Sequence, residues 1–314
     1  MNRKMKKLLF IANPVAGQEV RQNFLDVIDR FVKGGYDVTV ETTQYSGHAP
    51  EIILARGAMF DTIVVSGGDG TLNEAFHAMI EAKNRGIVMP PLGYIPAGTV
   101  NDFAVSHDIP TDMIRAAEII VEGNVRECDV GMLGERPFAY VAAFGSFTDT
   151  SYSTPQKMKN RFGKLAYLFH GASHLNYAFH PYSMKIEYDG GVLEGDFVYG
   201  SASNSRSIGG MKIQLESKVS LDDGKFEVIL FENPSSPHRM HRLVRAMLKR
   251  KADGHVAYQF STSYLRVTAT EPVAWTTDGE YGGSYGEVEL TSVNRAVKFI
   301  VPKECKYFGE AKLV

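Results

Sequence analysis

The chain has 314 residues, enough for two domains that each bury a hydrophobic core. Hydrophobic residues make up 44% of it and charged residues 22%, a composition that excludes a fibrous or disordered chain. Its 34 lysines and arginines against 36 aspartates and glutamates give a net charge of −2, so no global basic field attracts nucleic acid.

The cysteines and the N-terminal residues indicate the cellular compartment in which the protein is expected. Cys128 and Cys305 are the only cysteines and form no CxxC motif, which favours a reducing cytoplasm. The apolar run 8–12 is too short for a signal peptide and stops at Asn13 and Pro14, so it predicts an opening strand. No stretch approaches the ~20 apolar residues of a membrane span. We therefore expect a cytoplasmic protein that reaches any lipid from the surface.

Strand and helix patterns alternate through the first part of the chain. Apolar runs of strand length occur at 8–12, 38–42, 62–65, 92–95 and 126–130. Helical spacing of apolar residues falls between them, at 24–32, 51–59, 75–80 and 113–121. Since strands that alternate with helices form parallel sheets, we predict an α/β, Rossmann-like domain with a parallel sheet over residues 1–131.

The pattern changes after this domain. Runs typical of β-strands, separated by turn residues, occur at 138–144, 183–188, 197–201, 226–231, 264–268 and 288–290. Helical patterns interrupt them at 156–175 and 237–251. We predict a mainly β domain, a sandwich, over residues 132–294. The run 297–301 indicates that the last segment, 295–314, returns to the first domain.

Residues 67–74 read GGDGTLNE and join the strand 62–65 to a helix. The glycines permit positive φ and let successive N–H groups line one concave surface, where the helix N-terminus adds positive potential for phosphate. Asp69 repels bare phosphate, so it indicates a divalent cation or a positioned hydroxyl beside the anion, as in phosphoryl transfer. The loop lacks the lysine of a Walker A motif. The alternative is an ordinary turn, but five special residue types at this junction favour phosphate binding.

Three more loops follow strands of the same domain. Residues 13–17 follow the first strand, Thr43 follows the second, and 96–103 follow the strand at 92–95. Because an open parallel sheet binds ligands at the carboxyl ends of its strands, we expect all four loops to converge. Taken singly, Asn13 and Pro14 are more typical of a plain turn.

The order and spacing of these loops resemble a known family. NPVAG at 13–17, GGDGTLNE at 67–74 and PAGTVNDFA at 96–104 are similar to the diacylglycerol kinase catalytic domain of soluble bacterial lipid kinases, relatives of sphingosine and ceramide kinases. LDDGKFEV at 221–228 and TTDGE at 276–280 extend the resemblance over nearly the whole chain. It implies an NAD-kinase-like first domain followed by a β-rich lipid-substrate domain.

The resemblance implies where ATP and the proton acceptor lie. ATP would be bound by Asn13, Pro14, Val15, Ala16, Gly17, Thr43, Ser66, Gly67, Gly68, Asp69, Gly70, Thr71, Leu72, Asn73 and Thr99. Glu280 would be the catalytic base, since phosphorylating an alcohol needs a carboxylate near its hydroxyl, and Asp69 would orient the metal and water network. From the residues alone, an acidic hairpin turn in solvent is the favoured interpretation of Asp278 to Glu280.

A Mg²⁺ site is implied in the second domain. Its ligands would be the Asp223 carboxylate with the backbone carbonyls of Ser220 and Lys225, oxygen donors that suit a hard cation. A plain Asp-Asp-Gly turn has the same sequence. Where many relatives carry an arginine, this chain has Val105, so a phosphate contact there is not expected. Asp102 either supports the metal network or caps a helix.

Two segments could reach lipid. The helix predicted at 238–251 has Met240 and Leu243 on one face and arginines around it, so it either lies against anionic headgroups or packs on the sheet. The basic and apolar stretch 157–169 favours substrate access. Trp275 either lines a cleft or belongs to the core.

These patterns together predict an ATP- and Mg²⁺-dependent lipid kinase that phosphorylates the primary hydroxyl of diacylglycerol or a similar lipid alcohol, in peripheral contact with a membrane surface. The alternatives are an NAD kinase, a kinase for another lipid alcohol, and a non-enzymatic lipid- or nucleotide-binding regulator. The oligomeric state stays open, with a homodimer as one option.

Overall fold

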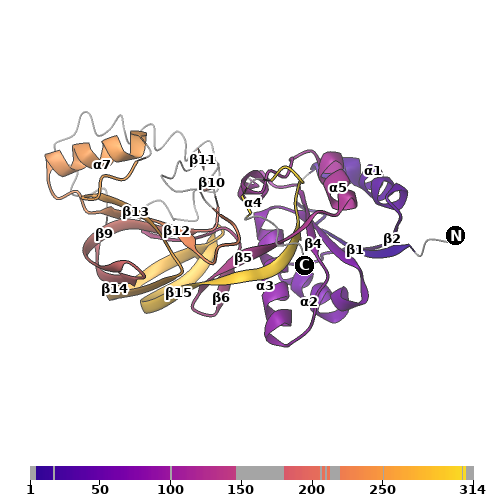
Figure 1. Ribbon diagram of the computed structural model, residues 1–314, viewed down its shortest axis with the longest axis horizontal. Coiled ribbons are helices and arrows are strands. Elements are labelled where there is room, and N and C mark those ends of the chain that lie inside the picture. Colours follow the sequence, from indigo (N-terminus) through magenta and orange to yellow (C-terminus); the bar gives the residue numbers. More distant parts are fainter. Residues whose placement is uncertain are drawn as a thin grey trace. The chain divides into compact units, whose positions relative to one another are not determined.

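The computed structural model describes residues 5–16, 18–99, 101–145, 180–205, 207–208, 211–212, 220–249, 251–305 and 307–308 (Figure 1). The chain divides into two compact units. Unit 1 comprises Met1–Val130, Leu221–Asp223 and Asn294–Val314, and unit 2 comprises Gly131–Ser220 and Gly224–Val293. The main boundaries lie one residue before those expected from the sequence, and the assignment of Leu221–Asp223 to unit 1 was not expected. The helix expected at 156–175 and the stretch 157–169 lie outside the described residues.

Unit 1 contains a parallel sheet. Its strands are β1 (Lys6–Ala12), β2 (Tyr36–Thr42), β3 (Thr62–Gly67) and β4 (Leu92–Pro96). β1 pairs in parallel with β2 and with β3, and β3 pairs in parallel with β4. β3 and β4 are buried along their whole length, which is typical of parallel strands covered on both faces. These pairings are those that the alternation of strand and helix patterns predicts.

Helices cover both faces of this sheet. α1 (Gln18–Lys33) and α5 (Met113–Glu122) lie on one side of the strands, and α2 (His48–Arg56) and α3 (Asp69–Asn84) lie on the other (Figure 1). A short 3₁₀ helix, Gly57–Met59, follows α2, and α4 (Asp102–Ser106) follows β4. α5 begins where the Asp112 side chain accepts a hydrogen bond from the Arg115 N–H and ends at Gly123 in the left-handed conformation. β5 (Val125–Leu133) comes next.

The C-terminal segment returns to unit 1, as expected. β15 (Glu280–Ile300) begins in unit 2, and its residue Phe299 pairs in parallel with Leu92 of β4. Phe299 stacks on Phe76 of α3 and lies edge-on to Phe103 of α4. This strand end is therefore part of the hydrophobic core of unit 1.

Unit 2 is built from long antiparallel strands. They are β6 (Arg136–Phe138), β7 (Val141–Gly145), β8 (Tyr182–Tyr188), β9 (Gly191–Ser203), β12 (Phe226–Glu232), β13 (Ala257–Thr262) and β14 (Tyr264–Thr277), followed by β15. β10 (Ser207–Ile208) and β11 (Met211–Lys212) form a separate pair.

The prediction of a two-sheet sandwich is wrong in its pairing. The strands of unit 2 follow one continuous hydrogen-bonded path, β13-β12-β9-β7-β14-β15, and β8 also pairs with both β9 and β14. β9 and β14 are long enough to pair with β8 over one part and with β7 over another. A single sheet thus encloses the core, because two shared strands join what would otherwise be separate sheets. Trp275 belongs to that core, 2% exposed and 4.8 Å from the Phe144 ring, and does not line a cleft.

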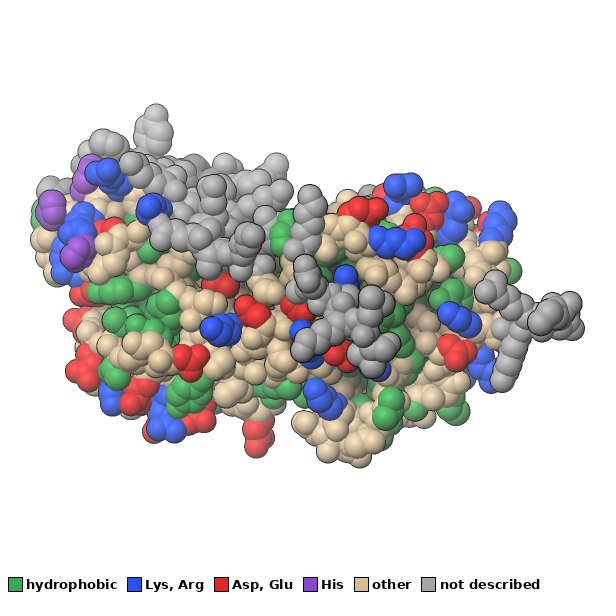
Figure 2. Space-filling view, viewed as in Figure 1, with side chains coloured by type: hydrophobic (Ala, Val, Ile, Leu, Met, Phe, Trp, Pro, Cys, Tyr) green, Lys and Arg blue, Asp and Glu red, His purple; other side chains and the backbone are tan. Residues whose placement is uncertain are grey.

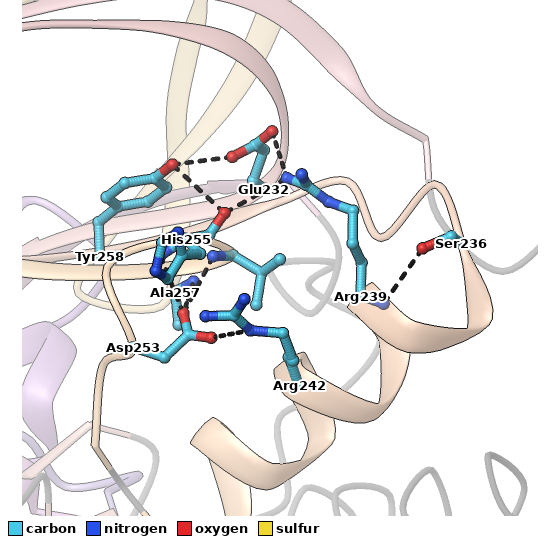
Figure 3. Close-up of polar contacts among 9 residues, drawn as sticks. Glu232, Ser236, Arg239, Arg242, Asp253, His255, Ala257 and Tyr258 are labelled. Atoms are coloured by element: carbon cyan, nitrogen blue, oxygen red, sulfur yellow. Dashed lines mark hydrogen bonds and ion pairs between the residues drawn. The ribbon is translucent and has the colours of Figure 1, made fainter.

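Helix α7 (Pro237–Lys249) packs on β12 and β13 through ion pairs (Figure 3). Arg239 bonds to Glu232 at 2.5 Å, and Glu232 also accepts the Tyr258 hydroxyl. Arg242 bonds to Asp253 at 2.7 Å. The packed-helix interpretation is thus confirmed for these two arginines. Among the described residues, no helix is long and apolar enough to span a membrane.

We expect the stability of unit 1 to fall as the pH drops from about 6.5 to 4. His107 is buried, its ring stacks on Phe103 at 3.8 Å, and burial lowers its pKa to about 4 despite a hydrogen bond to the Phe103 carbonyl. In this window the unfolded chain takes up the proton and the folded chain does not, so the free energy of unfolding decreases, by roughly 3 kcal/mol at pH 4.

Urea unfolding of the wild type, His107→Phe and His241→Phe across this range measures the effect. Loss of the slope in His107→Phe alone is expected, because His241 is exposed on α7. An unchanged slope in His107→Phe would contradict this assignment.

Candidate functional site

Four loops meet at the carboxyl edge of the parallel sheet in unit 1. The Asn13 N–H donates to the Ser66 carbonyl at 2.9 Å, the Thr43 N–H to Ala12 at 3.0 Å, and the Ala97 N–H to Gly67 at 2.8 Å. Each bond joins the residue after one strand to the end of its neighbour. The convergence expected from the sequence is therefore present, because parallel strands end at the same edge.

Asn13 links the first loop to the glycine loop. Its side-chain amide donates to the Thr71 hydroxyl at 3.0 Å, and its side-chain oxygen accepts the Val15 N–H at 3.1 Å. Asn13 therefore does more than form a local turn: it fixes residues 13–15 to the first turn of α3.

The glycines of two loops touch each other. A Cβ atom on Gly98 would lie 2.7 Å from the Gly68 Cα and 2.9 Å from the Asn101 side-chain oxygen. A Cβ on Gly67 would lie 2.5 Å from the Thr71 hydroxyl oxygen. Gly67, Gly68 and Gly70 are not among the described residues with positive φ, so the expectation that they supply such conformations is wrong. Gly68 lies against the backbone of Gly98, whereas Gly67 lies against the Thr71 side chain.

A buried brace supports this contact. The Tyr94 hydroxyl donates to the Gly67 carbonyl at 3.0 Å and lies 3.3 Å from the Asn101 side-chain oxygen. Asn101, in the left-handed conformation, bonds to the Gly98 N–H and carbonyl at 3.0 and 2.8 Å. Burial, with the nearby charge of Asp69, raises the pKa of Tyr94 well above its usual value, so the hydroxyl stays protonated. Sequence reasoning missed both residues, although Asn101 stands inside a loop that it singled out.

Asp69 begins α3 beside the start of α4. Its carboxylate accepts the Asp102 N–H at 3.3 Å. Gly68, the residue that caps α3, has no side chain, and its carbonyl accepts the Leu72 N–H at 3.2 Å. Asn101, not Asp102, occupies the cap position of α4, and Asp102 is its buried first residue.

The predicted ATP residues differ in their exposure. Exposed or half-buried ones are Asn13, Pro14, Val15, Ala16, Gly68, Asp69, Gly70 and Thr99. Buried ones are Thr43, Ser66, Gly67, Thr71, Leu72 and Asn73. Gly17 lies outside the described residues. The first group is accessible to a ligand, through side chains or, at Gly68 and Gly70, through the backbone, whereas the second is enclosed by the protein.

Glu280 stands at a turn in unit 2, whereas Asp69 belongs to unit 1. β14 ends at Thr277 and β15 begins at Glu280, whose side chain is 61% exposed. The Arg136 guanidinium lies 3.8 Å from the Glu280 carboxylate. Asp278 in the same turn is buried, so the interpretation of the whole turn as solvated is wrong for that residue.

The loop proposed to bind Mg²⁺ is held by residues that the sequence did not single out. The Asp129 N–H donates to the Leu221 carbonyl at 2.8 Å, and the Asn294 amide donates both to the Asp222 carbonyl and to the Asp129 carboxylate. Asp223 is exposed, and Gly224 has a φ of 77°. In the ranges that the structure describes, no three His, Cys, Asp or Glu side chains cluster as metal ligands, so carbonyl oxygens would have to complete a site here.

Comparisons with known proteins agree with one another. Residues 7–133 match the model of the diacylglycerol kinase catalytic domain. The chain is similar to the diacylglycerol kinase of Bacillus subtilis (strain 168), with 31% identity over 96% of this chain and 98% of the relative. It is 32% identical to that of Staphylococcus aureus (strain JH9), over 95% and 93%. A solved structure of a diacylglycerol kinase from Bacillus anthracis str. Sterne shares its fold, with a TM-score of 0.74 at 21% identity, over 97% of this chain and all of that one.

We expect Gly98→Ala to weaken nucleotide binding about tenfold or more, because the new methyl group would push the two glycine loops apart. Titration of the purified protein with a fluorescent ATP analogue measures this. Gly286→Ala is the matched control, since a Cβ at Gly286 meets no atom within 4 Å. Equal affinity of both variants and the wild type would show that the contact of Gly68 and Gly98 does not shape a nucleotide site.

Proposed function

This chain belongs to the diacylglycerol kinase family, and we propose that it transfers the γ-phosphoryl group of ATP to the primary hydroxyl of diacylglycerol, giving phosphatidic acid. The observation that carries the proposal is the likeness to curated diacylglycerol kinases over nearly the full length of both chains. The loop edge of unit 1 and the exposed carboxylate of Glu280 supply groups that such a transfer needs.

ATP is proposed to lie against the loops of unit 1. The N–H groups that open α3 present positive potential to phosphate oxygens, and Gly68 and Gly98 bring the backbones of the two loops close together there. The bond from Asn13 to Thr71 holds the loop at 13–15 beside them. The exposed side chains of Val15 and Thr99 are then available to the rest of the nucleotide.

Mg²⁺ is the proposed cation, and when bound it neutralises charge on the phosphate oxygens. Asp69 is exposed enough to orient it directly or through water. Asp223, with the carbonyls of Ser220 and Lys225, would hold a second, structural ion, and these oxygen donors fit a hard cation. Neither set includes nitrogen or sulfur, which disfavours zinc.

Glu280 is the proposed general base. Its exposed carboxylate can accept the hydroxyl proton of the lipid as the oxygen attacks phosphorus, and the Arg136 guanidinium lies 3.8 Å from it. The alternative of an NAD kinase has less support, because the curated relatives that match at nearly full length are named diacylglycerol kinases. A silent regulator has less support too, since Asp69 and Glu280 are both present.

Peripheral contact with an anionic membrane surface, from the cytoplasmic side, is part of the proposal. Figure 2 shows histidine and basic side chains gathered over the end of unit 2 that carries α7. The exposed members on that helix are His238, His241 and Arg245, whereas Arg239 and Arg242 are engaged by Glu232 and Asp253. The charge available to headgroups is thus smaller than the sequence of the helix suggests.

We expect Glu280→Gln to lower kcat by roughly 10²- to 10⁴-fold with little change in ATP affinity, because the amide cannot take the proton. Turnover on diacylglycerol in mixed micelles, with ceramide, sphingosine, undecaprenol and NAD as rival acceptors, measures this. Glu287→Gln is a close control: it lies on the same strand, is 63% exposed and is also 3.8 Å from an arginine.

Unchanged turnover in Glu280→Gln would reject the base. Turnover on NAD but on no lipid would favour the NAD kinase, and turnover on no acceptor would favour a binding protein.

A further inference from the structure

The turn that carries Glu280 is a two-residue hairpin loop. Thr277 pairs with Glu280, and the residues between them, Asp278 and Gly279, have φ values of 50° and 87°. Asp-Gly is a preferred sequence for a type I′ turn, which needs positive φ at both central positions. The backbone of this turn therefore explains the choice of Asp and Gly, but it does not require the Asp side chain to bond to anything.

The carboxylate of Asp278 nevertheless makes long-range bonds. One oxygen accepts the Ala139 N–H at 2.6 Å, and the other accepts the N–H groups of Tyr140 and Val141 at 3.0 and 2.9 Å. The Asp278 N–H in turn donates to the Val141 carbonyl at 2.8 Å. Bonds from N–H groups to a buried carboxylate are among the stronger hydrogen bonds in proteins, so this turn is pinned to the link between β6 and β7.

The same link also reaches Glu280. Arg136 opens β6, directly before the residues that bind Asp278, and its guanidinium lies 3.8 Å from the Glu280 carboxylate. The N–H groups of residues 139–141 thus bind the Asp278 carboxylate, and the guanidinium of Arg136 lies near the carboxylate of Glu280. Another two-residue Asp-Gly hairpin turn of unit 2 differs: Asp189, between Tyr188 and Gly191, is exposed and bonds to Ser263.

We propose that Asp278 and Arg136 are positioning residues for Glu280: the Asp278 carboxylate fixes the turn, and Arg136 fixes the direction of the Glu280 side chain. This rests on the proposed role of Glu280 as base. Neither residue exchanges a proton with substrate in this proposal. Both act by keeping one carboxylate in place, and a displacement of about 1 Å in a reacting group can cost on the order of 100-fold in rate.

Two substitutions of Asp278 separate its side chain from its backbone. Asn and Gly both tolerate positive φ, so Asp278→Asn and Asp278→Gly keep the turn. In Asp278→Asn an NH₂ group replaces one acceptor oxygen, and in Asp278→Gly all three side-chain bonds are lost. We expect kcat on diacylglycerol micelles to fall roughly 10- to 100-fold, with KM for ATP within about twofold of the wild type. Asp189→Asn is the matched control, with kcat unchanged.

A double-mutant cycle distinguishes positioning from general stabilisation. In a Glu280→Gln background, Asp278→Asn and Arg136→Gln are each expected to lower kcat no further, because the group they position is already absent. Each single variant should lower kcat and leave KM for ATP within about twofold of the wild type. A purely structural role would lower the melting temperature and leave kcat of the folded enzyme unchanged.

The outcomes separate this inference from the proposed function. An active Glu280→Gln overturns the base and, with it, the inference. An inactive Glu280→Gln together with wild-type kcat in the Asp278 and Arg136 variants overturns the inference alone. Should neither Asp278 variant fold, Arg136→Gln decides: a fall in kcat that vanishes in the Glu280→Gln background supports positioning, and additive or absent effects refute it.

Discussion

The contact between the backbones of Gly68 and Gly98 is the constraint on which the arrangement of the loops at the carboxyl edge of unit 1 depends. Two loops that follow neighbouring parallel strands approach so closely that a Cβ on Gly98 would lie 2.7 Å from the Gly68 Cα. Close approach leaves amide groups at that surface, and amide groups are what phosphate oxygens bind. Tyr94 and Asn101 bond to Gly67 and Gly98, so the positions of the two loops depend partly on buried side chains.

Two Asp-Gly hairpin turns of unit 2, at Asp189 and Asp278, show how one local sequence serves two purposes. Both join antiparallel strands with two residues, and in both the aspartate accepts backbone N–H groups. At Asp189 the acceptor is exposed and its bonds to Ser263 lower the pKa of the carboxyl. At Asp278 the acceptor is buried and the following strand begins with Glu280. Burial of the carboxylate, rather than the turn, sets Asp278 apart.

Local patterns predicted the elements of unit 1 well, because its strands are buried runs bounded by turns. The apolar run 8–12 became β1, and 92–95 became β4. The convergence of the loops also followed from the sequence, since all strands of a parallel sheet have their carboxyl ends at the same edge.

Contacts between residues far apart in the chain could not be predicted from the sequence. Tyr94 reads as one more strand residue until its hydroxyl is placed at the Gly67 carbonyl, and Asp129 meets Asn294 only in the folded chain. The prediction of a sandwich for unit 2 was wrong for the same reason. Alternation of apolar and polar residues identifies strands, but the lengths of β9 and β14 and the strands beside them decide whether one sheet forms or two.

The charges of the proposed site argue for a cation. No lysine or arginine occurs in residues 13–17, 66–73 or 96–103, whereas Asp69 and Asp102 do. Backbone amides offset part of the charge of a triphosphate, but Asp69 opposes it at the start of α3. A divalent cation between them would remove this repulsion, because both the Asp69 carboxylate and the phosphate oxygens attract the cation. In the proposed site, the acidic loop and the absence of a lysine are therefore consistent with a cation that binds together with the nucleotide.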